Sequence, residues 1–112
     1  MTEIKVFKKG EVYTKITCDG HTGYGVFGED VVCASVSSIV QTAALGMLAV
    51  AGANVIVKRD QKNAFFEIII PNDLSQSCAH DVQTIFATMM CGLSDLYSQY
   101  SDFIEMEVQD VL

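Results

Sequence analysis

The sequence predicts an α+β domain in which two helices pack on a mixed, mainly antiparallel sheet, with the elements in the order ββαββαβ. Three patterns lead to this prediction: apolar residues alternate over 12–18, no charged residue occurs over 31–57, and apolar residues recur at three-and-four spacing over 82–100. The 112 residues are predicted to form one domain, 1–112. With 50% hydrophobic and 19% charged residues, the chain has the composition of a folded domain rather than a disordered one.

The chain is predicted to begin with two strands and a glycine-rich loop. A short strand starts at Ile4, and residues 8–10 indicate a tight turn. Over 12–18 apolar and polar residues alternate, so the second strand has one buried face. A loop is predicted over 19–30, because half of the chain's eight glycines fall there and glycine reaches backbone angles that other residues avoid. These glycines are Gly20, Gly23, Gly25 and Gly28.

A helix over 31–51, followed by a strand, is predicted for the uncharged stretch. Its length would suffice to span a bilayer, but polar residues interrupt it and Gly52-Ala53-Asn54 indicates a turn that divides it. We therefore expect no membrane span. Asp30 is placed to cap this helix. Because the helix is apolar nearly all round, it needs cover on more than one side, and we expect a homodimer.

The second half of the chain is predicted to form a hairpin, a helix and a closing strand. Residues 55–59 and 65–70 indicate two strands joined around 60–63, and Pro71 ends the second of them. The next helix is predicted to begin near residue 74 or 75 and to carry a core-facing apolar stripe. A closing strand covers 103–108. The stripe consists of Val82, Ile85, Phe86, Met89, Leu93, Leu96, Tyr97 and Tyr100.

The charge of the chain indicates what kind of partner it binds. Seven basic and fourteen acidic residues give a net charge of −7. Such a surface repels phosphate backbones, so we expect no direct nucleic-acid partner and favour a cationic protein or peptide. The first residues lack the basic and apolar regions of a signal peptide, so we expect a cytoplasmic protein whose four cysteines are reduced.

Cys33 and His21 are the candidate catalytic residues. Cys33 falls three residues after the expected helix cap, where unpaired backbone amides and the helix dipole favour a thiolate and can hold an oxyanion. His21 lies twelve residues upstream in the glycine loop, and a histidine paired with a cysteine is one way to activate a sulfur nucleophile. The residue types alone leave open a buried packing cysteine and a surface histidine.

Two further residues are candidates for a supporting role. Asp30 can orient His21, as the third member of a catalytic group often does, or it can only cap the helix. Ser37 lies one turn after Cys33 on the same helix face. Its hydroxyl can form a hydrogen bond near the sulfur or can satisfy a backbone carbonyl.

Three other chemistries fit the sequence less well. A zinc site from Cys18, His21 and Cys33, completed by Cys78 or His80, lacks the paired spacing of structural zinc sites. A phosphate-binding loop would need a Gly-Lys-Ser/Thr sequence, which does not follow the glycines. A catalytic pair of Cys78 and His80 is disfavoured because neighbouring helix positions point in different directions. We therefore expect no metal and no other cofactor.

Residues 20–37 carry a resemblance to a known family. They read GHTGYGVFGEDVVCASVS, and this resembles the Prp family of ribosomal-processing cysteine proteases, whose pattern runs Gly-His, a glycine-bearing loop, Gly-x-Asp, and a Val/Ile-rich Cys-Ala-x-x-Ser. Thr22 stands where the family more often has a smaller residue. The matching residues are Gly20, His21, Gly28, Asp30, Cys33, Ala34 and Ser37.

The resemblance implies a specific activity. It implies a cytosolic, dimeric endopeptidase that removes the N-terminal extension of a basic large-subunit ribosomal protein by cutting after a Phe-Phe pair. Cys33 would be the nucleophile, and His21 the general base and then the acid for the leaving amine. The loop 20–28 would close over the substrate. The alternative is a non-enzymatic ribosome-assembly or protein-binding module that uses the loop for recognition.

Overall fold

A five-stranded sheet forms one layer of the protein. The structure, a computed structural model, describes residues 1–20 and 29–111. The strands are β1 (Thr2–Lys9), β2 (Val12–Gly20), β3 (Ile56–Asp60), β4 (Phe65–Ile69) and β5 (Ile104–Asp110), in the spatial order β3-β4-β2-β1-β5. β1 and β5 run parallel, while the other neighbouring strands are antiparallel. The predicted mixed, mainly antiparallel sheet is confirmed.

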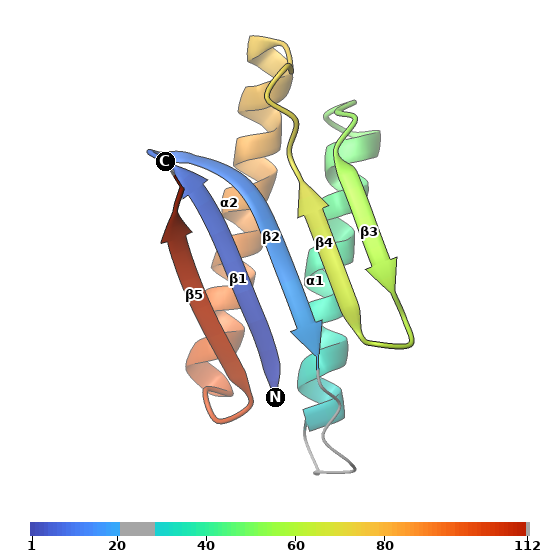
Figure 1. Cartoon of the computed structure of the whole chain (residues 1–112), viewed down its shortest axis with the longest axis vertical. Coiled ribbons are helices and arrows are strands. Elements are labelled where there is room, and N and C mark those ends of the chain that lie inside the picture. The colour runs from blue at the N-terminus through green and yellow to red at the C-terminus, as the bar shows by residue number, and fades with distance from the viewer. Residues whose placement is uncertain (21–28, 112) are drawn as a thin grey trace.

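Two helices, α1 (Glu29–Ala49) and α2 (Gln76–Gln99), form the second layer on one face of the sheet (Figure 1). The element order is therefore the predicted ββαββαβ. Ser75 caps α2, because its hydroxyl accepts a hydrogen bond from the backbone amide of Cys78. The apolar stripe of α2 is buried over Val82, Phe86, Met89 and Leu93, whereas the last residues predicted for it, Tyr97 and Tyr100, are 40% and 39% exposed. The stripe therefore extends past the end of the core.

The core lies between the helices and the inner face of the sheet. The buried residues of α1 recur every three or four positions, which is the spacing of one helix face. The side chain of Gln83 links α2 to β2 through two hydrogen bonds. It accepts one from the Tyr13 backbone amide at 2.9 Å and donates one to the Tyr13 carbonyl at 2.8 Å. The buried residues of α1 are Val32, Val36, Val40, Ala43, Ala44 and Met47.

The outer face of the sheet is polar. Glu67 in β4 lies between Lys15 and Lys58, with N–O distances of 3.6 and 3.8 Å. Opposite charges on neighbouring strands stabilise this face without a second layer of helices. The fold is thus a two-layer sandwich with one core.

Most element boundaries differ from the prediction by one or two residues, and three of these differences change the place of a residue in the fold. Helix α1 begins at Glu29 rather than residue 31, so Asp30 lies within its first turn and not at the cap position. Strand β2 continues through Gly20, so the first two residues of the predicted loop belong to the sheet. Strand β1 continues to Lys9, and the turn that follows places Gly10 at a φ of 62°, a backbone angle that favours glycine.

Helix α1 keeps a large apolar area in solvent. Leu45 is 64% exposed and Val50, just past the helix, is 84% exposed. Residues Val31–Ala49 also have the length and hydropathy of a membrane span, but their inner face packs against the sheet and α2 as the core of this fold. The homodimer expected from this helix stays a prediction.

Candidate active site

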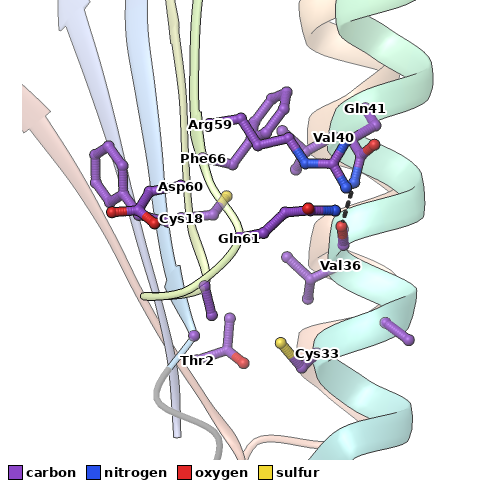
Figure 2. Close-up of a pocket in the computed structure, with 15 residues that line it drawn as sticks. Thr2, Cys18, Cys33, Val36, Val40, Gln41, Arg59, Asp60, Gln61 and Phe66 are labelled. Carbon is purple, nitrogen blue, oxygen red and sulfur yellow. Dashed lines mark hydrogen bonds between the residues drawn. The ribbon is translucent and has the colours of Figure 1, made fainter.

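A cavity of about 310 Å³ lies between the N-terminal half of α1 and the strands β2, β3 and β4. The partly exposed Cys33 forms part of its wall, and its sulfur points toward the sheet (Figure 2). The wall nearest the core is apolar, and the end of β3 and the turn after it add polar side chains. The lining includes Cys18, Gly20, Cys33, Val36, Ser37, Val40, Gln41, Arg59, Gln61 and Phe66.

Helix α1 begins at Glu29, earlier than predicted, so Cys33 is its fifth residue. Side chains of a helix lean toward its N-terminus, so the sulfur lies over the first turn even though the Cys33 backbone does not belong to it. The amides of a helix's first four residues have no partner within the helix. These free amides of the first turn of α1 are therefore the backbone hydrogen-bond donors beside the Cys33 sulfur.

Gly20 lies directly against the sulfur. A Cβ atom added to Gly20 would be 2.7 Å from the Cys33 Sγ, which is closer than real Cβ contacts. The backbone amide of Gly20 donates a hydrogen bond to the Ala64 carbonyl at 2.8 Å, which fixes the end of β2 beside the β3–β4 turn. Gly20, predicted as a loop residue, is therefore the buried last residue of a strand. Its lack of a side chain makes room for Cys33.

Ser37 lines the cavity one turn after Cys33, as predicted. Its hydroxyl oxygen accepts a hydrogen bond from the Gln41 side chain (Figure 2), so its own proton points away from Gln41. The serine that satisfies a backbone carbonyl in this helix is Ser35, which donates to the Val31 carbonyl at 2.8 Å. Cys33, Ser37 and Gln41 thus form one row at four-residue spacing along α1.

A second sulfur, that of Cys18 in β2, also lines the cavity (Figure 2). Burial, and to a smaller extent the charge of a Cys33 thiolate, raises the pKa of Cys18 to about 12. Cys18 is therefore a neutral thiol at physiological pH. It is a packing residue in the cavity wall and not a nucleophile.

The polar wall comes from residues for which sequence reasoning gave no signal. Arg59 at the end of β3 and Gln61 in the following turn project across the cavity toward α1 (Figure 2). Only the pairing of β3 with β4, and of β4 with β2, brings them there. Gln41 could have been found in the sequence, because it continues the four-residue spacing from Cys33 and Ser37.

The remaining predicted site residues fall outside the part that the structure describes. His21, Gly23, Gly25 and Gly28 belong to the segment 21–28, which is not described. The backbone of Asp30 is in the first turn of α1, but its side chain is not described.

The zinc alternative does not fit the fold. The Cys78 thiol donates a hydrogen bond to the Ala51 carbonyl, just beyond the C-terminal end of α1. The helix from Cys33 to Ala49 is about 24 Å long at a rise of about 1.5 Å per residue. Cys78 and His80, at the start of α2, are therefore too far away to complete a metal site with Cys18 and Cys33.

Comparison with known proteins gives the family. The family model of cysteine protease Prp matches residues 1–105. The ribosomal processing cysteine protease Prp of Staphylococcus aureus (strain Mu50) is 24% identical over 104 residues, which cover 93% of each chain. The fold is similar to those of two crystal structures of an essential ribosomal processing protease Prp from S. aureus. One is in complex with a substrate peptide (TM-score 0.86, 20% identity, 97% of this chain and 100% of that chain), and the other with a covalently linked product peptide (TM-score 0.82, 21% identity, the same coverage). The cavity beside Cys33 and the match over nearly the whole chain lead to one conclusion: the chain belongs to the cysteine protease Prp family and is a cysteine peptidase.

Proposed function

We propose that this peptidase uses Cys33 as its nucleophile and His21 as its general base. The observation that carries the proposal is the partly exposed Cys33 sulfur, which lies in a cavity and against Gly20. His21 is the next residue after Gly20 in the chain. A histidine is one of the residue types that can take the proton of a cysteine thiol.

The reaction follows the chemistry of a Cys/His pair. The imidazole takes the thiol proton, and the thiolate attacks the carbonyl carbon of the scissile peptide bond. Amide donors at the start of α1 stabilise the resulting oxyanion. When the tetrahedral intermediate collapses, the imidazolium gives its proton to the leaving amine and a thioester remains on Cys33. The imidazole then takes a proton from a water molecule, whose attack releases the acid product and the free thiol.

The shape and lining of the cavity support an extended peptide substrate. From Cys33 to Gln41 the cavity follows α1 for eight residues, which is about 12 Å and matches three to four residues of an extended chain. Its apolar wall runs from Val36, one turn from Cys33, to Val40 and Phe66 farther along α1. An apolar wall of this kind suits aromatic side chains, in agreement with cleavage after a Phe-Phe pair.

We propose as substrate the N-terminal extension of a basic large-subunit ribosomal protein. The relatives described above are named ribosomal processing proteases, and the net charge of −7 favours a cationic substrate protein. We also propose that the protein acts in the cytoplasm as a homodimer. The exposed apolar side chains of Leu45 and Leu48 on α1 are the surface that a second copy would cover.

Cleavage of a defined peptide tests this function. A peptide that contains Phe-Phe-Ala within a basic sequence is incubated with the protein, and the cleavage point is located by mass spectrometry. The wild type should cut after the second Phe, whereas Cys33→Ala and His21→Ala should not cut. Cys91→Ala is the matched control, because Cys91 is exposed on α2 and lies outside the cavity.

Two outcomes would contradict the proposal. Cleavage by Cys33→Ala at the wild-type rate would exclude this sulfur as the nucleophile. Tight binding of the peptide by the wild type without cleavage would favour the non-enzymatic binding module.

A further inference from the structure

Arg59 is the one arginine in a chain of net charge −7, and its side chain extends into the candidate active site. In the β3–β4 pair Arg59 lies opposite Phe66, whose side chain packs against the core. Side chains that face each other in an antiparallel pair lie on the same side of the sheet. Arg59 therefore lies on the side of α1, and Figure 2 shows it crossing the cavity toward Gln41.

Two carboxylates on β3 and β4 are engaged elsewhere. Asp60, the next residue, accepts hydrogen bonds from the side-chain and backbone nitrogens of Asn63, at 2.6 and 3.2 Å. Glu67 faces Lys15 and Lys58 on the other side of the sheet. Among the side chains that the structure describes, those of 1–20 and 31–111, no carboxylate forms an ion pair with Arg59. The cavity thus holds a guanidinium group whose charge is not neutralised by the described part of the chain.

The position of Arg59 relates it to one stretch of the substrate. Its side chain reaches toward Gln41, about 12 Å along α1 from Cys33 at a rise of about 1.5 Å per residue. A peptide that extends from the sulfur advances about 3.3 Å per residue and reaches this point at its third or fourth residue. Phe66 lies opposite Arg59 in the β3–β4 pair, so this stretch of the cavity offers an apolar side chain beside the guanidinium.

We propose that Arg59 is a specificity residue that binds an acidic side chain of the substrate, Asp or Glu, at the third or fourth position from the scissile bond. The planar guanidinium matches a carboxylate with two parallel hydrogen bonds. The side-chain amide of Gln61, which also points toward α1, is a second donor for the same carboxylate. This inference rests on the proposed function, since it assigns a binding role in the same site.

Matched peptides and a charge reversal test it. Glu, Gln or Lys is placed at the third and fourth positions on either side of the bond in the Phe-Phe-Ala peptide, and kcat/KM is measured for each. At one of these positions the wild type should prefer Glu over Lys by about tenfold or more, the size of a hydrogen-bonded charge pair. Arg59→Gln should abolish this preference, and Arg59→Glu should reverse it.

Lys58→Gln is the matched control. Lys58 is the preceding residue in β3, points to the opposite face and contacts Glu67 there. This variant loses the same charge and should keep the preference of the wild type. The same peptides are also bound to Cys33→Ala and followed by fluorescence anisotropy, which measures the preference without turnover.

The outcomes separate this inference from the proposed function. Cleavage at equal rates for Glu, Gln and Lys peptides, unchanged in Arg59→Glu, overturns the role of Arg59 and leaves the peptidase activity standing. If no peptide is cut, the proposed function fails. In that case equal affinities of the Glu and Lys peptides for Cys33→Ala overturn the present inference, and a tenfold difference that Arg59→Gln removes supports it.

Discussion

Replacement of Gly20 by alanine should displace the Cys33 sulfur without disturbing the fold. The new methyl carbon would lie 2.7 Å from the Cys33 Sγ, whereas ordinary contacts begin near 3.4 Å, so the two atoms must separate by at least about 0.7 Å. The cysteine side chain can turn about a single bond, but the Gly20 backbone is fixed by its hydrogen bond to Ala64. We therefore expect the sulfur, and not β2, to move.

The expected loss of activity follows from this displacement. A misplacement of about 1 Å at a reacting atom costs about 100-fold in rate, so kcat/KM for the Phe-Phe-Ala peptide should fall by about that factor in Gly20→Ala. Alkylation by iodoacetamide, followed by mass spectrometry of each cysteine, gives a second measurement that needs no substrate. The rate at Cys33 should change, while the rate at the exposed Cys91 should not.

Gly46→Ala is the matched control for this prediction. It introduces the same methyl group in the helix that carries Cys33, but the new carbon would meet Ile85 at 3.7 Å, which is an ordinary contact. This variant should keep its activity and gain about 0.5–1 kcal/mol of helix stability. If Gly20→Ala retains the wild-type kcat/KM and the wild-type alkylation rate at Cys33, the close approach of β2 to the sulfur does not exist in solution.

Two further predictions concern stability. Burial raises the pKa of Cys18 from about 9 to about 12, so the thiol loses its proton at a lower pH in the unfolded chain than in the folded protein. The stability that the buried neutral thiol contributes is therefore complete below about pH 9 and is lost as the pH approaches 12. The free energy of unfolding, measured in urea with a reductant, should therefore fall more steeply over this pH range in the wild type than in Cys18→Ala, and the difference should be on the order of 4 kcal/mol. Identical slopes would contradict a raised pKa at Cys18. Gln83→Ala removes both side-chain hydrogen bonds to the Tyr13 backbone and should lower the free energy of unfolding by about 2 kcal/mol. The control Gln99→Ala loses an exposed hydrogen bond to Asp95 and should change the free energy of unfolding by less than about 0.5 kcal/mol. Similar losses in both variants would refute a special role for Gln83.

The sequence predicted those parts of the fold that depend on local periodicity. The alternation in β2 and the apolar stripe of α2 each describe one face of one element, and the structure buries the middle of each face, whereas Val12, Tyr97 and Tyr100 at the ends are exposed. The start of α1 was predicted two residues late, because Asp30 has the residue type of a cap but lies inside the helix. A residue type that suits two neighbouring helix positions does not fix the boundary.

Of the described cavity wall, the sequence predicted the helix side and Gly20. Cys33 and Ser37 are one turn apart, so their common face follows from sequence spacing alone. Arg59 and Gln61 face them across the cavity because β4 pairs with β2, a contact between segments about fifty residues apart that no local pattern encodes. The role of Gly20 was missed for a related reason, since a glycine kept for close packing has the same appearance in a sequence as a glycine in a loop.

The contact between Gly20 and Cys33 also has a consequence for covalent inhibitors. The backbone of β2 shields one side of the sulfur, so an electrophilic warhead has to approach from the open side, past the β3–β4 hairpin. A compound with a compact reactive group and an acidic tail of about 12 Å would place that tail at the guanidinium of Arg59. Reagents that are bulky around their reactive carbon should spare this thiol and modify the exposed Cys91 instead.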